Sequence, residues 1–255
     1  MRHGFAALII IVILGIAAVR DPIDQLRAAA ERLDVTLELE WKYPKVLPAG
    51  VVDGRNATRG EIEVLAGVIA CELDFYPPDF IKRFGLRRII LGKDLSFNGQ
   101  RRMGMPDSAN NALYLDVTPG LAYGKLDVPF ARRTIHHELM HMVDWADDHQ
   151  MFIDDGWEAL NPSPFKYLGG GEQMRGDYAG QLKEMPNFLN SYSTASVAED
   201  KAEIFSYLMT NDKFATSRLY FDPVLHKKAD LLKVELKKFS PSINEYFWSI
   251  IAIRS

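Results

Sequence analysis

The segment TIHHELMHMVDWADD, residues 134–148, constrains the fold most, because it gathers three of the chain's six histidines within a few turns. Its apolar residues recur at the spacing of one helical face, which predicts a helix with a buried side. On such a helix His137 and His141 lie one turn apart, so their side chains point in the same direction. Their ring nitrogens can therefore converge on one ion, with the Glu138 carboxylate at the rim of that face.

Chance is a poor explanation of the H-E-x-x-H pattern, since a chain of this length and composition would contain it with a probability of about 0.01. Paired histidines on a buried helix also need a partner. We therefore interpret His137 and His141 as metal ligands, and His136, which points to the helix flank, as structural. A di-iron bundle is excluded because it needs a second Glu-x-x-His copy, which the sequence lacks.

The remaining composition limits the chemistry and the partners. Cys71 is the only cysteine, so any metal site must use histidine and carboxylate. A net charge of −4 and a pI of about 5.9 give no reason to expect a nucleic-acid partner. Residues 5–19 form an apolar run behind Arg2 and His3, which predicts a signal peptide over residues 1–19. We expect an exported protein, periplasmic or secreted, which stays tethered to the membrane if this segment is an uncleaved anchor.

The rest of the chain is predicted as a single domain over residues 20–255. Asp21-Pro22 predicts the start of a first helix, and Thr58 to Glu61 form a capping-box pattern before a second. Strands are expected over residues 35–41, 87–91 and 112–117, loops over 42–57 and 154–193, and closing helices from Asp222-Pro223 to Phe239 and from Ser240-Pro241 onward.

A catalytic zinc site needs a third protein ligand. The best candidate lies in residues 191–209, where an apolar stripe predicts a helix and Glu199 and Glu203 share another face. We expect Glu199 to bind the metal and Glu203 to hold the far N–H of a ligand histidine. Glu199 could instead complete a capping box with Ser196. The other acids that could supply the third ligand are Glu203, Asp200, Asp154, Asp155 and Glu158.

The two helical motifs together resemble the gluzincin zinc metallopeptidases. HHELMHMVDWA and AEDKAEIFSYLM are most similar to the anthrax-lethal-factor-like peptidase domains, and the likeness covers roughly residues 129–255. It implies an α+β, zincin-like metallopeptidase domain, mostly helical with a small mixed sheet beside the active-site helix. It also implies Zn²⁺ as the cofactor and a peptide or protein as the substrate.

The resemblance further implies a role for each motif side chain. His137, His141 and Glu199 would bind zinc, and Glu138 would act as the general base. Tyr192 would assist the reacting oxygen, and Glu203 and Asp144 would support the ligands. The separation of His141 and Glu199 in the sequence is longer than the toxin domain leads us to expect, and we interpret the region of Gly169–Gly171 as an insertion. His226 is a weak candidate for thermolysin's cleft histidine.

Two alternatives remain at this stage. The strand at residues 112–117 could be an edge strand that pairs with an extended peptide, or a plain strand inside the sheet. The chain as a whole could be a zinc-dependent peptidase, or a non-catalytic exported protein that binds zinc or a partner on a peptidase fold.

Overall fold

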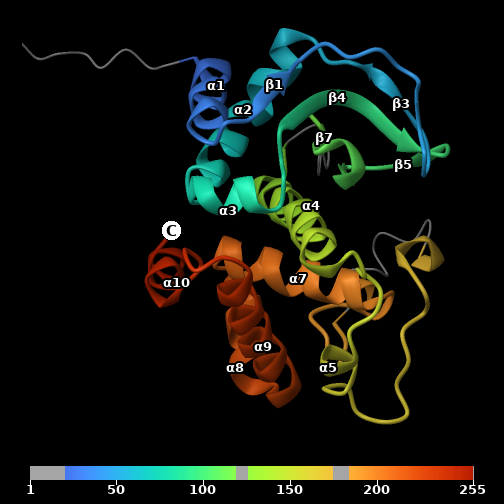
Figure 1. The fold of residues 1–255 in the computed structure, drawn as a ribbon, viewed down its shortest axis with the longest axis vertical. Helices are drawn as coiled ribbons and strands as arrows, with labels where there is room; N and C mark the ends of the chain where they lie inside the picture. The colour runs from blue at the N-terminus through green and yellow to red at the C-terminus, as the bar shows by residue number, and fades with distance from the viewer. Residues whose placement is uncertain (1–20, 119–125, 175–183, 255) are drawn as a thin grey trace, which may run out of the picture.

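The computed structural model describes residues 21–118, 126–174 and 184–254 (Figure 1). The predicted signal segment lies outside these residues. The helices are α1 (Pro22–Arg32), α2 (Arg59–Leu73), α3 (Pro78–Arg83), α4 (Val128–Asp148), α5 (Asp155–Glu158), α7 (Val197–Thr210), α8 (Lys213–Phe221), α9 (Pro223–Phe239) and α10 (Glu245–Ala252). Within the described ranges, no helix combines the length and apolar character that a membrane span requires.

The strands form one mixed sheet in the N-terminal half. They are β1 (Thr36–Glu38), β2 (Lys45–Leu47), β3 (Gly50–Asn56), β4 (Arg88–Phe97), β5 (Gln100–Arg101), β6 (Gly104–Asp107) and β7 (Ala112–Asp116). The order is β2-β3-β4-β7-β6, with β1 and β5 also pairing with β4. The pairs β1–β4 and β4–β7 are parallel and the others antiparallel. β7 therefore lies inside the sheet, so residues 112–116 are a plain strand and not an edge strand that could pair with a peptide. β6 forms the edge of the sheet beside α4.

Alternation along β4 and β7 buries both faces of the sheet. Ile89 and Leu113 face the main core, which continues through the helices to α10, whereas Ile90 and Tyr114 face a smaller cluster with Trp41. The chain is thus a mixed α/β structure, mostly helical, with a small mixed sheet beside α4, and this part of the expected fold class is confirmed (Figure 1).

Several predicted element boundaries hold because their capping side chains act as expected. Asp21 accepts a hydrogen bond from the Ile23 amide, and Thr58 and Glu61 form the reciprocal capping box of α2. The prediction that Ser240-Pro241 opens the last helix is wrong. Ser240 ends α9 by donating its amide to the Leu236 carbonyl, and the Asn244 side chain caps α10 instead.

The loop expected over residues 42–57 is also a wrong prediction, because β2 and β3 form a hairpin there. The strand expected over residues 35–41 is shorter than predicted, and β4 runs on to Phe97. Helices α3 and α8 were not predicted. The segment after residue 154 is, as expected, mostly irregular in its described part.

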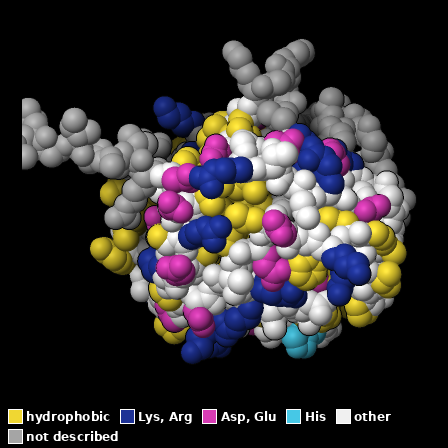
Figure 2. Space-filling view, turned by 90° about the horizontal axis from the view of Figure 1, so that it is seen from above, with side chains coloured by type: hydrophobic (Ala, Val, Ile, Leu, Met, Phe, Trp, Pro, Cys, Tyr) yellow, Lys and Arg dark blue, Asp and Glu magenta, His cyan; other side chains and the backbone are white. Residues whose placement is uncertain are grey.

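Surface charge is mixed on the face shown in Figure 2, where Lys and Arg side chains alternate with Asp and Glu around exposed apolar groups. That face carries no continuous patch of one sign.

A buried carboxylate fixes α4 against α2 and the C-terminus. Glu72 of α2 accepts from Arg132 Nε at 2.8 Å, lies 2.6 Å from His136 Nε2, and accepts from Arg254 at 2.6 Å. The other ring nitrogen of His136 lies 2.5 Å from the Tyr76 hydroxyl. This network explains the structural role expected for His136, since it turns the ring away from His137.

Replacing Glu72 by Gln should lower the free energy of unfolding at pH 7 by about 3 kcal/mol, because it leaves buried cationic partners without their counter-charge. Burial favours the protonated carboxyl, but His136 and Arg254 outweigh it and lower the pKa of Glu72 to about 2. The stabilisation is therefore complete above the usual pKa of 4.5 and is lost as the pH falls toward 2.

Urea denaturation of both proteins between pH 7 and pH 3 measures this difference. Glu63→Gln on the same helix is the control, since Glu63 only pairs with Arg59 at the surface. Equal stability of wild type and Glu72→Gln at pH 7 would contradict the anchoring role.

Candidate metal centre

Two packed helices carry the motif residues. Asp127 caps the start of α4, where its side chain accepts from the Phe130 amide, and His149 caps the end in a left-handed conformation. Ser196 caps the start of α7, where its hydroxyl accepts from the Glu199 amide at 3.2 Å. The predicted apolar stripes are buried, among them Ile135 and Leu139 on α4. With the stripes buried together, the polar faces of α4 and α7 meet at one place.

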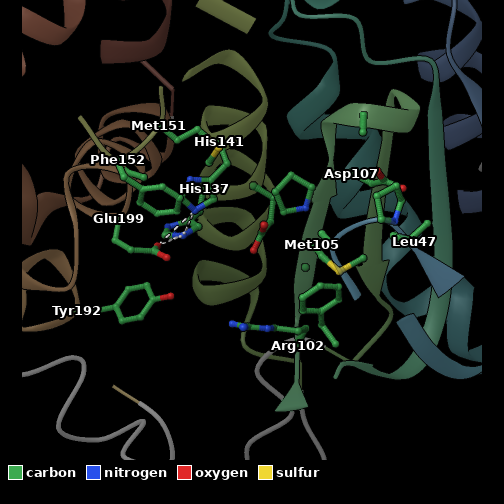
Figure 3. A pocket seen from close by; sticks show the side chains of 18 residues that line it. Leu47, Arg102, Met105, Asp107, His137, His141, Met151, Phe152, Tyr192 and Glu199 are labelled. Atoms are coloured by element: carbon green, nitrogen blue, oxygen red, sulfur yellow. Dashed lines mark hydrogen bonds and ion pairs between the residues drawn. The ribbon is translucent and has the colours of Figure 1, made fainter. Parts of the chain in front are cut away.

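His137, His141 and Glu199 meet at the crossing of α4 and α7 (Figure 3). The two Nε2 atoms are 3.1 Å apart, and Glu199 Oε2 lies 3.0 Å from that of His137 and 3.3 Å from that of His141. Both histidines are nearly buried, at 9% and 7% exposure. Although Ser196 caps the helix, the Glu199 carboxylate turns to the histidines and does not reach back to the helix start.

The spacing of these three atoms fits a zinc ion. With bonds of about 2.0–2.1 Å and tetrahedral angles, two ligand atoms on zinc are about 3.3 Å apart. The observed 3.0–3.3 Å is close to that separation. Two imidazole nitrogens and one carboxylate oxygen are also a donor set that zinc accepts. No further His, Cys, Asp or Glu of the described residues joins the cluster.

Glu203 lies one turn after Glu199 and reaches the far side of His137. Its Oε1 is 2.9 Å from His137 Nδ1, and its Oε2 accepts from Asn190 Nδ2 at 2.6 Å. A carboxylate at this nitrogen fixes the ring orientation and directs Nε2 toward the cluster. This is the geometry that the predicted supporting role of Glu203 requires.

The other acids considered in the sequence have different partners. Asp144 Oδ1 and Asp154 Oδ2 accept from Lys201 at 3.1 and 2.7 Å, and Asp200 pairs with Lys228 at 2.7 Å. No hydrogen bond joins Asp144 to His141. Asp155 and Glu158 lie on the short helix α5 outside the cluster, and His226 is exposed on α9 beside Asp230.

Glu138 lies against the edge strand β6. A Cβ placed on Gly104 would collide with Glu138 Cγ and Cδ, so a larger residue at position 104 would displace the Glu138 side chain. Glu138 lines the same cavity as His137 and His141, and the charges of both histidines act on its carboxyl group. Sequence reasoning missed Gly104, which has no motif around it.

Tyr192 and the glycine-rich segment border the cluster on another side. The negative charge of Glu199 helps to raise the pKa of the Tyr192 hydroxyl, and the Tyr192 ring centroid is 6.0 Å from that of His137. A Cβ on Gly171 would fall 2.6 Å from both the Tyr192 hydroxyl and Glu199 Oε1. The Gly169 and Gly170 amides donate to the Ala195 carbonyl. The segment that looked like an insertion thus forms part of the site.

Charge and burial shift the pKa values of the cluster strongly. Burial alone would lower the pKa of His137, but Glu199 and Glu203 raise it well above its usual range. Burial would raise the pKa of Glu199, yet the two histidines hold it well below that of a free carboxyl. Burial is the largest effect on Glu138 and raises its pKa. The pKa of Tyr192 is raised well above its usual value by burial and by the charges of Glu199 and Glu138.

The cluster opens onto a cavity of about 390 Å³ between α4 and the sheet. His137, Glu138, His141, Tyr192 and Glu199 line one side. The remaining lining residues are mostly apolar, and most of them come from the β2–β3 hairpin, from β6 and from the loop after α4, together with Arg102 (Figure 3). The three candidate ligands are therefore accessible to a molecule that enters from solvent.

A solved structure shares this fold. It is a protein of Bacteroides caccae whose assignment as a zinc-binding metallo-peptidase is itself provisional, and it matches with a TM-score of 0.55 and 15% identity over 91% of each chain. At that identity the likeness shows the fold alone. No family model matches the sequence, and no curated protein does.

Glu199→Gln should weaken binding of Zn²⁺ by the purified protein by more than about 100-fold, because it removes a ligand charge. Glu203→Gln should weaken it by about 10-fold to 100-fold, since it only loosens the His137 ring. Competition with a chromogenic chelator measures both affinities, and Glu158→Gln is the surface control. If Glu203→Gln proved the more damaging substitution, the roles of the two acids would be exchanged.

Proposed function

We propose that this chain is a zinc-dependent hydrolase that cleaves peptide bonds, of the gluzincin type. The observation that carries the proposal is the convergence of His137, His141 and Glu199 at a cavity, with the Glu138 carboxylate beside them. A structural zinc site is closed by four protein ligands, whereas a catalytic one keeps a position for solvent or substrate. Three ligands facing a cavity favour the catalytic kind over the non-catalytic alternative.

The residue roles follow from this arrangement. Zinc held by His137, His141 and Glu199 would supply an acidified water at neutral pH and positive charge for the developing oxyanion. Glu138, which makes no ion pair with another of the described residues, would accept the proton of the attacking water and deliver it to the departing amine. The Tyr192 hydroxyl would donate a hydrogen bond to the oxyanion, a contact worth about 3 kcal/mol. Glu203 would keep the His137 ring in place.

The edge strand β6 supports a peptide as the substrate. The Asp116 amide donates to the Met103 carbonyl at 2.9 Å, so Met103 and, by alternation, Met105 and Asp107 bond to β7. The backbone groups of Gly104 and Pro106 then face the open side of the strand, next to the cluster. An extended peptide could pair with them as an added strand.

We also propose that the protein is exported, on the basis of the apolar segment at residues 5–19.

Glu138→Gln should retain zinc and lose peptide hydrolysis by a factor of about 10²–10⁴, the usual contribution of a general base. Hydrolysis of a quenched-fluorescence peptide library, together with metal analysis of the same samples, measures both properties. Full activity of Glu138→Gln, or loss of its zinc, would remove Glu138 from the proposed role.

Gly104→Ala should lower kcat by about 100-fold without lowering the zinc content, because the added methyl displaces Glu138 and touches no ligand. Gly60→Ala is the matched control, since a Cβ there meets nothing within 4 Å. An unchanged kcat in Gly104→Ala would show that the contact between β6 and Glu138 does not position the carboxylate.

A further inference from the structure

We propose that Arg102 is a specificity-determining residue that binds a carboxylate of the substrate, an inference that rests on the proposed hydrolysis of peptide bonds. The carboxylate would belong to an Asp or Glu side chain close to the scissile bond, or to the free C-terminus of the peptide.

The position of Arg102 is fixed by the sheet. It follows β5, and its amide donates to the Leu95 carbonyl of β4 at 2.9 Å. The side chain extends across the cavity from the wall opposite Tyr192 (Figure 3). The guanidinium lies near enough to the reacting groups that its charge opposes the rise in the pKa of both Glu138 and Tyr192.

Arg101, the preceding residue, has the ion pairs that are expected of an arginine with a structural role. Arg101 pairs with Asp94 at 3.1 Å and with the buried Asp116 at 3.0 Å. Arg102 points to the other side of the chain, where its guanidinium donates to the neutral Gln100 Oε1 at 3.1 Å. Among the described residues, no carboxylate lies within 4.0 Å of it. Its charge thus lacks a direct counter-ion in this part of the structure.

The rest of the lining makes this guanidinium selective. Among the described residues that line the cavity, Arg102 is the only Lys or Arg, and its neighbours there include the apolar Phe97 and Met105. The Glu199 carboxylate is committed to the histidines, and Asp107 to Asn110. A guanidinium beside apolar side chains binds a carboxylate through two parallel hydrogen bonds and offers nothing comparable to an amide or an ammonium group.

Pairs of peptides that differ in one carboxylate test the proposal. One series carries Glu or Gln at each position around a single cleaved bond, and the other has a free or an amidated C-terminus. For the wild type, kcat/KM should be about 10-fold to 100-fold higher for the carboxylate member of one series, and the responding series identifies the source. In Arg102→Met the ratio should fall to about one, and Arg102→Glu should prefer Lys at that position.

Arg27→Met is the matched control, because it removes one arginine charge from the exposed face of α1 and should leave the ratio unchanged. Thermal melting of each variant confirms that it is folded. Equal rates of wild type on both members of every pair would overturn the proposal. A uniform loss in Arg102→Met on all peptides would overturn it too, since that result indicates stabilisation of the oxyanion.

A binding measurement separates this inference from the proposed function. Hydroxamate-capped tripeptides with Glu or Gln can be titrated calorimetrically into the zinc-loaded protein, which requires no turnover. If the wild type cleaves no peptide, the proposed hydrolysis fails, while a Glu preference in binding that disappears in Arg102→Met still supports Arg102. Equal affinity of the two hydroxamates for wild type would contradict it.

Discussion

The packing of α4 against α7 through buried charges is the constraint on which the site depends. His137 and Glu203 meet at one point of the interface, and Lys201 and Asp144 at another. Each of these groups would be costly to bury alone, by several kcal/mol, so a shift of one helix along the other would break both pairs. Apolar side chains drive the two helices together, whereas the charged pairs set the register in which Glu199 faces the histidines.

Asp200 extends this constraint to the irregular part of the chain. It follows Glu199 on α7 but faces away from the cluster, and it is fully buried. Its Oδ2 accepts from Lys228 at 2.7 Å, Trp157 Nε1 at 3.0 Å and the Tyr167 hydroxyl at 2.7 Å. A segment with little secondary structure and the helix α9 are thereby attached to the residue next to a candidate ligand. The buried network substitutes for the regular hydrogen bonding that a loop cannot provide.

The sequence predicts the parts of the site that rest on helical periodicity. His137, His141 and Glu199 follow from residues one turn apart on amphipathic helices, a local pattern that packing then preserves. Gly104 and Arg102 could not be predicted in the same way. Gly104 lies in the short strand β6 and Arg102 directly follows the short strand β5, both too short to show alternation, and the importance of both residues comes from neighbours distant in sequence. The partner of Asp144 could not be predicted either, because no local sequence pattern indicates that Lys201 of α7 reaches it.

The balance of charge around the histidines explains why a cation suits this place. Glu199 and Glu203 both contact His137, and Glu138 lies in the same cavity, so three carboxylates surround two imidazoles in a poorly solvated region. Burial would lower the pKa of His137, but the negative charges of Glu199 and Glu203 raise it well above its usual range. A divalent ion at the cluster would supply positive charge itself, and neutral imidazoles would bind it, as ligation requires. Glu138 is the third carboxylate, and the positive charge of Arg102 in the same cavity offsets part of its negative charge.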